Sequence, residues 1–353
     1  MPKIILRAIV YLIVMLCIAA VVIFTQLQRY LDTPLTIPEQ GMEYGLTRGG
    51  SLISVTHSLS KQGVLDFPRV FTVYCRLSGR GDSIKAGDYF FKRGLTPRKL
   101  LNKLERGDVQ YFQVTLVEGW RQLQILSALR SQQKLDVSLA DTEQEINANQ
   151  LGIDVPYQSL EGLFFPDTYR YHSGTTDIEL LQQAYQRMQN VLEEAWRGRS
   201  ENLPYANAYE ALIMASLVEK ETGDASERAE IAGVFVRRLR KGMRLQTDPA
   251  IIYGLGAGFD GNLRSRHLKD ASNPYNTYRH HGLTPTPIAL AGREAIHAAL
   301  HPAGGESLYF VAKGDGSHYF SRTLEEHQKA VRKYQIYQRR KDYSSAPRIK
   351  SSD

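Results

Sequence analysis

The N-terminal part of the chain is a continuous apolar run. Ala8–Phe24 carries no charged or strongly polar side chain, and the apolar character extends over Ile4–Leu27, with Arg7 near one end. A helix of about 17–25 residues, rising about 1.5 Å per residue, crosses the roughly 30 Å hydrocarbon core of a bilayer. Lys3 and Arg7 precede the run, so the positive-inside rule predicts a cytoplasmic N-terminus and an exported remainder.

A cleaved signal peptide is the alternative interpretation of this run. It is disfavoured because the run is longer than the apolar part of a usual signal peptide and no small-x-small site ends it. Cys17 follows Val14, Met15 and Leu16, which are not the small residues of a lipoprotein cleavage site. We therefore predict a cytoplasmic stub and transmembrane helix over residues 1–30.

A linker over 31–45 and a small mixed unit over 46–110 follow. The predicted elements of this unit are a helix over 51–62, an apolar element over 68–77, a strand ending at 91 and a helix from 97 to 107. Thr96 and Pro97 have the residue types of an N-cap and a first helical position, and Gly107 those of a helix end. The pattern predicts a small α+β module.

A larger unit is predicted over 111–340, before a polar, disordered tail over 341–353. Its predicted elements are a strand over 111–117, an amphipathic helix over 178–198, a nearly apolar and therefore buried helix over 209–220, a loop-rich stretch over 246–321 that contains a hairpin (308–312 with 318–321), and a closing helix over 325–340. The fold class of the whole chain is α+β, with an N-terminal transmembrane helix.

Composition and charge limit the kinds of partner and ligand that we expect this chain to bind. With 353 residues, 42% hydrophobic and 23% charged, the chain has room for about two folded domains. The net charge of +7 suits an anionic membrane or polymer, but no nucleic-acid motif accompanies it. His297 and His301 have the spacing of a zinc pair without the glutamate base, and Pro302 follows at once. We expect neither a nucleic-acid partner nor a cofactor nor a metal.

Two carboxylates lie at the end of the predicted buried helix. Glu219 and Glu221 are two positions apart and so project about 200° apart on a helix. A carboxyl held against apolar walls keeps its proton near neutral pH and is suited to protonate an acetal oxygen. The alternative on spacing alone is a fraying helix end with solvated charges.

Several separate blocks of residues resemble one enzyme family. The blocks are Ala215–Thr222, Arg244–Pro249 with Ile252–Gly254, Asn273–Tyr278, Gly282–Ile288, Val117–Gly119, Phe165–Tyr169 and Tyr309–Ala312. Taken in chain order, from about Gly45 to Tyr337, they resemble the endolytic murein transglycosylase family. That family consists of bacterial inner-membrane enzymes with one N-terminal anchor and a periplasmic domain. The resemblance implies a LysM-like peptidoglycan-binding module over 46–110 and a catalytic domain over 111–340.

The resemblance also implies the chemistry. Glu221 matches the catalytic acid/base, which protonates the oxygen leaving from the MurNAc–GlcNAc bond and then takes the proton of the MurNAc 6-hydroxyl. The product is a 1,6-anhydro-MurNAc end, and no second carboxylate is required. Glu219 is expected either to orient or raise the pKa of Glu221 or to make a structural hydrogen bond. The remaining candidate substrate-binding residues are Gln246, Thr247, Asp248, Tyr253, Asn276 and Tyr278.

Two other functions stay open at this point. One is a hydrolase of the same bond, and the other is a non-catalytic scaffold that binds peptidoglycan. Thr284 and Thr286 stand where relatives often have Pro or Gly, which leaves the role of the proline-rich loop open. The implied partners are glycan strands, the inner membrane and, as candidates, the peptidoglycan synthases beside which the family is thought to act, setting strand length.

Overall fold

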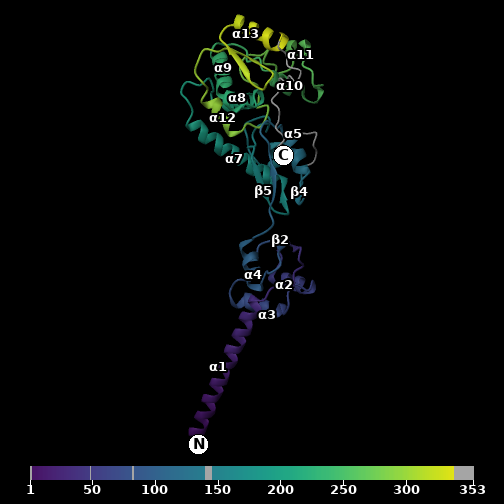
Figure 1. Cartoon of the computed structure of the whole chain (residues 1–353), viewed down its shortest axis with the longest axis vertical. Helices are drawn as coiled ribbons and strands as arrows, with labels where there is room; N and C mark the ends of the chain where they lie inside the picture. Colours follow the sequence, from purple (N-terminus) through teal and green to yellow (C-terminus); the bar gives the residue numbers. More distant parts are fainter. Residues whose placement is uncertain (1, 48, 82, 140–144, 338–353) are drawn as a thin grey trace. The chain divides into compact units, whose positions relative to one another are not determined.

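A computed structural model of the chain describes residues 2–337 except 48, 82 and 140–144 (Figure 1). The backbone forms two compact units. Unit 1 comprises the chain up to Phe112 together with Tyr171–Gly174, and unit 2 comprises Gln113–Arg170 and the chain from Thr175 onward. The predicted tail over 341–353 and the predicted helix end at Arg340 lie outside the described residues.

Unit 1 is a two-stranded antiparallel sheet covered by short helices. Its elements are α1 (Pro2–Asp32), β1 (Met42–Leu46), α2 (Leu52–Lys61), α3 (Pro68–Leu77), β2 (Gly87–Phe91) and α4 (Pro97–Arg106). β1 pairs with β2 so that Tyr44 lies opposite Tyr89. The predicted ends of α4 are confirmed: the Thr96 hydroxyl accepts a hydrogen bond from the amide of Lys99, and Gly107 adopts a φ of 66°.

The last turn of α1 is part of unit 1. Ile5–Asp32 is long and apolar enough to cross a membrane, and its apolar residues are exposed as far as Phe24. Leu31 is fully buried in the core of unit 1, and Arg98 binds the side chains of Gln28 and Asp32. The last turn is therefore joined to the folded unit by both apolar packing and charge.

The structure differs from the linker predicted over 31–45. Leu35 and Ile37 are buried in the core of unit 1, and β1 begins at Met42. The polar and proline-containing composition of this stretch is typical of a linker, but its few apolar side chains cover the helices of unit 1. Residues 31–45 are thus part of the folded unit.

Helices dominate the rest of the chain, and the strands occur in pairs. The elements are β3 (Phe112–Thr115), α5 (Gln122–Arg130), β4 (Leu135–Asp136), α6 (Ala148–Leu151), β5 (Thr168–Tyr171), β6 (Thr175–Thr176), α7 (Asp177–Arg197), α8 (Ala208–Glu221), η1 (Ala225–Glu227), α9 (Arg228–Arg240), α10 (Asp248–Leu255), η2 (Gly256–Gly258), α11 (Ser265–Lys269), α12 (Arg293–Leu300), β7 (Tyr309–Ala312), β8 (His318–Ser321), α13 (Leu324–Val331) and η3 (Arg332–Tyr337). The strand pairs are β3–β5, β4–β6 and β7–β8. This mixture confirms the α+β class.

Helix α8 is the central element of unit 2. Its residues from Ala211 to Glu219 are all buried, and it packs against α7, α9, α10 and α12. The Asn207 side chain caps its first turn by accepting a hydrogen bond from the amide of Glu210. The predicted buried helix is confirmed, and its C-terminal end brings Glu221 to the junction with α10.

Two other predictions can be compared with the structure. The hairpin is confirmed, because β7 and β8 pair antiparallel with Val311 opposite Tyr319. The closing helix begins at Leu324 and continues as a π-helical segment to Tyr337. Helix α10 lies inside the stretch predicted to be loop-rich.

Candidate active site

Glu221 is the last residue of α8, where the backbone changes direction. Thr222 adopts an extended conformation (φ −138°, ψ 140°) and is buried, so the helix cannot continue past Glu221. The Glu221 side chain is half-buried among the surrounding protein. This burial raises the pKa of Glu221 from 4.5 to about 7, and the negative charge of Asp248 acts in the same direction.

The N-terminus of α10 supplies the direct partner of Glu221. The hydroxyl of Thr247 donates a hydrogen bond of 2.7 Å to Oε2 of Glu221, which favours the charged carboxylate and partly offsets the effect of burial. Asp248 accepts a hydrogen bond of 2.8 Å from the hydroxyl of Tyr278, and burial raises the pKa of both side chains. Three candidate residues named from the sequence thus lie together with Glu221.

Hydrogen bonds hold the segment just before α10 against the segment that carries Tyr278. The amide of Gln246 donates to the carbonyl of Thr277 (3.1 Å), and the amide of Thr247 donates to the Thr277 hydroxyl (2.9 Å). Gln246 has a φ of 53°, which is uncommon for a residue with a side chain and strains the backbone. Its side chain is exposed, while Thr247 is buried. The strained turn therefore directs Thr247 inward, toward Glu221.

A buried guanidinium lies behind the acid. Arg238 of α9 is 6% exposed and donates hydrogen bonds to the carbonyls of Leu245 (2.7 Å) and Leu308 (2.6 Å). Its positive charge lowers the pKa of Glu221, while burial lowers its own pKa. The sequence analysis did not identify this residue, because a basic residue in the last helical turn is also favoured by the helix dipole alone.

Glu219 faces a different set of neighbours. Its Oε1 accepts a hydrogen bond from Arg228 (3.1 Å), and its Oε2 accepts one from the backbone amide of Gly292 (3.0 Å). The side chain is buried, and that burial raises its pKa. These contacts join α8 to the starts of α9 and α12, which favours the structural alternative for Glu219.

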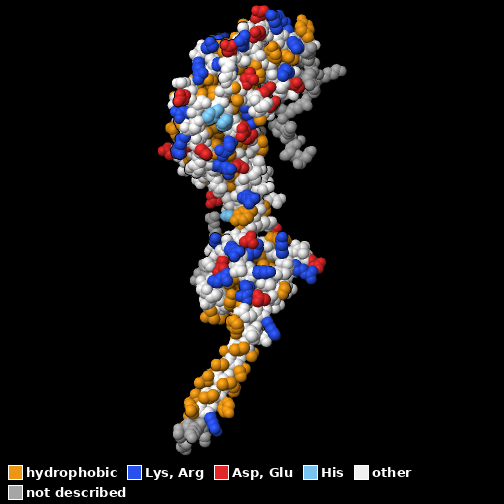
Figure 2. All heavy atoms as spheres, turned by 60° about the vertical axis from the view of Figure 1, so that its left-hand side comes forward, with side chains coloured by type: hydrophobic (Ala, Val, Ile, Leu, Met, Phe, Trp, Pro, Cys, Tyr) orange, Lys and Arg blue, Asp and Glu red, His pale blue; other side chains and the backbone are white. Residues whose placement is uncertain are grey.

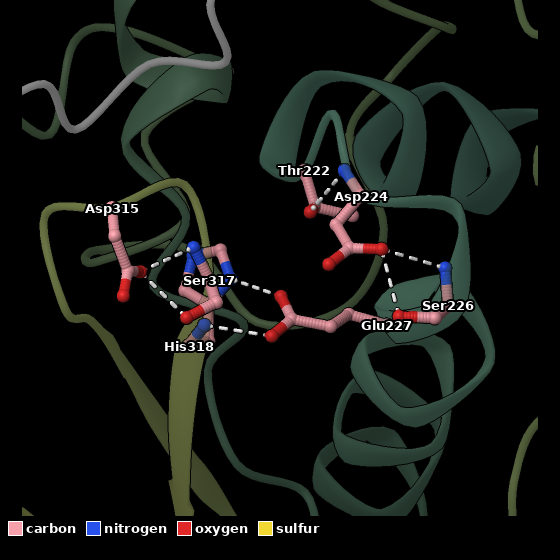
Figure 3. Close-up of polar contacts among 7 residues, drawn as sticks. All are labelled: Thr222, Asp224, Ser226, Glu227, Asp315, Ser317 and His318. Carbon is pink, nitrogen blue, oxygen red and sulfur yellow. Dashed lines mark hydrogen bonds and ion pairs between the residues drawn. The ribbon is translucent and has the colours of Figure 1, made fainter.

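The turn after Glu221 is fixed by a second polar network (Figure 3). Glu227 accepts hydrogen bonds from the backbone amide of His318 (2.8 Å) and pairs with its ring Nδ1 (2.7 Å). Asp224 caps η1 through Ser226, and the amide of Asp224 donates to the Thr222 hydroxyl. The hairpin β7–β8 is thereby tied to the segment that follows the candidate acid.

Comparison with known proteins identifies the family. The model of the YceG-like family matches residues 45–333, which include both α8 and α10. The chain belongs to the YceG-like family.

Curated relatives of this YceG-like chain carry an enzyme name. An endolytic murein transglycosylase of Bacillus subtilis (strain 168) is 34% identical over 303 residues, covering 81% of this chain and 82% of the relative. A protein of the same name from Streptococcus pneumoniae serotype 2 is 28% identical over 338 residues, covering 86% and 61%. A solved structure, the yceG-like protein lmo1499 of Listeria monocytogenes, is 25% identical, with a TM-score of 0.48 and coverage of 83% and 100%.

The YceG-like chain has a further buried carboxyl, Glu161, that the sequence analysis missed. Glu161 is 3% exposed, and burial raises its pKa from 4.5 to about 7. It accepts hydrogen bonds from the backbone amide of Gln122 (3.0 Å) and the hydroxyl of Tyr253 (3.3 Å). The ring of Tyr253 in turn contacts Tyr275 and lies under the guanidinium of Arg121. The available signal was a charged residue between Leu160 and the apolar run after Gly162.

Asn276 lies inside the loop rather than on its surface. It is fully buried, and its amide nitrogen donates to the carbonyls of His267 (3.0 Å) and Leu268 (3.3 Å), while its oxygen accepts from the amide of Tyr278 (3.1 Å). These bonds occupy both ends of the side chain. The geometry favours a role in shaping the loop that presents Tyr278.

A cavity of about 490 Å³ lies at the opposite end of α8 from Glu221. It is lined by Pro204, Asn207, Tyr209, Glu210, Ile213, Leu239, Gly282, Leu283, Thr284 and Pro285. Ile213 precedes Glu221 by eight residues, which is about 12 Å along a helix. Thr284 and Thr286 are buried, and their hydroxyls bond to carbonyls within their own loop. This cavity is separate from the candidate acid.

The structure also shows how the histidines and cysteines considered from the sequence are arranged. Among the described residues, no group of three or more His, Cys, Asp or Glu side chains has the arrangement of a metal site. The rings of His297 and His301 stack at 4.4 Å. Cys75 is a buried thiol, and burial raises its pKa to about 12.

Proposed function

We propose that this protein is a membrane-anchored endolytic lytic transglycosylase that cleaves the MurNAc–GlcNAc bond of nascent peptidoglycan strands. The observation that carries the proposal is the carboxyl of Glu221. It ends a buried helix, has a pKa raised to about 7 and lies beside Thr247 and Asp248 in a YceG-like chain. The names of the curated relatives support the same activity.

In the proposed reaction Glu221 acts twice. It first donates its proton to the glycosidic oxygen, and the bond between that oxygen and C1 of MurNAc breaks. The resulting carboxylate then takes the proton of the MurNAc 6-hydroxyl, whose oxygen bonds to C1 and closes the 1,6-anhydro ring. Glu221 ends protonated, and no water is consumed. A pKa near 7 suits both steps, because a general acid/base works best when its pKa is close to the working pH.

The neighbours of Glu221 supply its support. Thr247 orients the carboxyl, and Asp248 with Tyr278 form a polar wall on which sugar hydroxyls or acetamido groups bind. We also assign Gln246 and Tyr253 to substrate binding, Gln246 because its side chain is exposed at the strained turn. Asp248 is also the reason that hydrolysis of the same bond stays an alternative reaction. An ordinary glycosidase needs a second carboxyl to activate water.

We propose that α1 anchors the enzyme in the inner membrane, with the N-terminus cytoplasmic and unit 2 periplasmic. The basic residues before the apolar run support this orientation. The burial of Leu31 in unit 1 supports an anchor that continues into the fold. Residues 46–110 are proposed as a LysM-like module that binds glycan strands. Cleavage near peptidoglycan synthases would end strand elongation.

Digestion of purified sacculi by the full chain tests the proposal. The wild-type protein is expected to release anhydro-muropeptides, which mass spectrometry distinguishes from hydrolysed ends, heavier by one water. Glu221→Gln should reduce this release by about 10²–10⁴-fold while the protein stays folded, because only the proton transfer is lost. Glu194→Gln, which removes an exposed carboxyl of α7, is the matched control and should keep full activity.

Each other result has a definite meaning. Wild-type products that carry an added water would establish the hydrolase. Binding to sacculi without any cleavage would establish the scaffold. Normal release by Glu221→Gln would remove Glu221 as the acid/base.

A further inference from the structure

Helix α3 of unit 1 presents an apolar stripe to the outside. Together with the residue before the helix, the stripe (below, the α3 stripe) consists of Phe67, Val70, Val73 and Leu77, which are 69%, 42%, 54% and 84% exposed. Phe71 and Cys75, on the other side of the helix, are fully buried. The core of unit 1 therefore uses one face of α3 and leaves a second apolar face without a partner in the described structure.

The spacing of the α3 stripe makes it one continuous surface. Positions 70, 73 and 77 fall within about 60° on a helix that turns 100° per residue. Arg69 and Arg76 are both exposed and border the stripe along one side. Contiguous exposed apolar side chains next to basic ones are typical of a surface that lies in a lipid interface.

Contacts with α1 give the position of the α3 stripe. The hydroxyl of Tyr30 donates a hydrogen bond of 2.7 Å to the carbonyl of Asp66, and the Tyr30 ring meets the Phe67 ring edge-on at 6.1 Å. The start of α3 is thus held against the last turn of α1. Figure 2 shows apolar side chains on the surface of unit 1 at the end where α1 enters it.

The height of this contact above the bilayer follows from helix geometry. The apolar character of α1 extends to Leu27, and Tyr30 follows three residues later, about 4.5 Å along the helix axis. The headgroup layer on each side of a bilayer is roughly 5–8 Å thick. A transmembrane α1 therefore brings Phe67 to the level of the lipid headgroups.

We infer that the α3 stripe docks on the lipid interface of the bilayer that α1 spans, with Arg69 and Arg76 facing anionic headgroups. The inference rests on the proposed anchoring of α1. A lipid surface is the occupant that the contacts favour, because the stripe continues directly from the membrane helix and its flanking charges complement anionic lipid. Unit 1 is then held to the membrane by two elements, the helix and the stripe.

Fluorescence quenching in nanodiscs tests the inference on the full chain. The discs contain phosphatidylethanolamine and phosphatidylglycerol, with a fraction of lipids that carry a nitroxide quencher at headgroup level or, for the dye on α1, in the acyl chain. A single dye is placed at Val73→Cys in a Cys17→Ala background, since Cys75 is fully buried. The same dye at Glu194→Cys in unit 2 is the aqueous reference, and a dye at Ile18→Cys reports on α1.

The Val73 dye should be quenched at least threefold more strongly than the Glu194 dye. Exchange of the two flanking stripe residues, Val70→Ser and Leu77→Ser, should remove most of that difference. Both side chains are exposed, so the fold does not depend on them. If quenching persists in this background, the dye alone inserts and the inference is wrong.

The remaining outcomes separate this inference from the anchor. If lipid quenches the Ile18 dye and leaves the Val73 dye like the reference, the anchor holds and the inference is wrong. A Val73 dye shielded from aqueous iodide but not quenched by lipid would show that a protein surface, such as a second copy, covers the stripe. If the Ile18 dye is unquenched as well, both the proposed membrane anchor and the inference about the α3 stripe are wrong.

Discussion

At the scale of single residues, the protonation of Glu221 depends on a balance between burial and one hydrogen bond. Burial raises its pKa to about 7, while the Thr247 hydroxyl and the charge of Arg238 favour the carboxylate. The first step of the proposed reaction needs the protonated form. Activity should therefore fall as the pH rises through the pKa of Glu221, which gives the pH–rate profile a basic limb.

Removal of the Thr247 hydroxyl should move that limb to higher pH. Thr247→Val keeps the side-chain volume and deletes the hydrogen bond to the Glu221 carboxylate, so the pKa of Glu221 rises further. A hydrogen bond to a charged group contributes about 1.5–3 kcal/mol, so we expect a shift of about one pH unit or more. The measurement is kcat/KM for release of muropeptides between pH 5 and 9.

A conservative variant separates this effect from a general disturbance of the site. Thr247→Ser retains the hydroxyl, and its basic limb should stay at the wild-type position even if the rate drops. A limb that Thr247→Val leaves in place would show that the hydroxyl does not set the protonation of Glu221.

At the scale of elements, helix α10 and the loop after α11 fit together without spare room. A Cβ on Gly254 would lie 2.0 Å from Oδ1 of Asn273, whose side chain donates to the carbonyl of Ile251 and accepts from the amide of Tyr275. Asn273 therefore connects α10 to the segment that continues to Tyr278. A change at Gly254 should reach the candidate site through this connection.

Gly254→Ala gives a prediction in which two principles oppose each other. Helix propensity alone would make alanine more stable by about 1 kcal/mol, whereas the clash with Asn273 should cost about 1–3 kcal/mol and displace Tyr278. We expect a lower Tm and slower muropeptide release. Gly258→Ala, where a Cβ meets nothing within 4 Å, is the control and should leave both unchanged. A more stable Gly254→Ala protein would contradict the packing argument.

Elements whose signals are local were predicted from the sequence. The two ends of α4 are marked by residue types that favour helix ends, Thr96 and Pro97 at the start and Gly107 at the finish. The residues of α8 are apolar on nearly all sides, which predicts a buried helix. β1 was not predicted, because its pairing with β2 depends on residues more than forty positions away. α10 was missed because its Thr-Asp-Pro start also suits a turn, and the burial of Ala250 that fixes the helix comes from the rest of unit 2.

The residues of the candidate site likewise fall into those that the sequence indicated and those that it did not. The resemblance pointed to Glu221, Thr247 and Asp248, which the structure brings together. Glu161 and Arg238 were not found, because their surroundings come from distant segments: Tyr253 follows Glu161 by 92 residues, and Leu308 follows Arg238 by 70. A local sequence pattern cannot predict that a charged residue will be buried by segments so distant in the chain.

At the scale of the whole molecule, buried carboxyls give unit 2 a stability that depends on pH. The pKa of Glu161 is about 7 in the folded protein and about 4.5 in a solvated chain. Below pH 4.5 both states are protonated and the group has no effect. Between about pH 4.5 and 7 the folded state holds a proton that the unfolded state has lost, so the free energy of unfolding falls as the pH rises.

Glu161→Gln should remove this loss, because glutamine resembles the protonated carboxyl and keeps an acceptor for the amide of Gln122. The variant should match the wild type near pH 4.5 and exceed it above pH 7 by up to about 3 kcal/mol. Urea unfolding followed by tryptophan fluorescence measures this difference, since Trp120 and Trp196 both lie in unit 2.

Comparing the variant with the wild type separates the effect of the Glu161 carboxyl on stability from the opposite effect of buried histidines. Burial lowers the pKa of His301 and His327, and such histidines add stability as the pH rises toward 6.5, but they contribute equally to wild type and variant. Glu194→Gln, at an exposed position, should show no change of its effect with pH. A difference between Glu161→Gln and wild type that stays constant from pH 5 to 8 would mean that Glu161 titrates like a solvated carboxyl. Since that pKa and the one assigned to Glu221 have the same physical cause, burial within unit 2, the case for Glu221 as a proton donor near neutral pH would weaken with it.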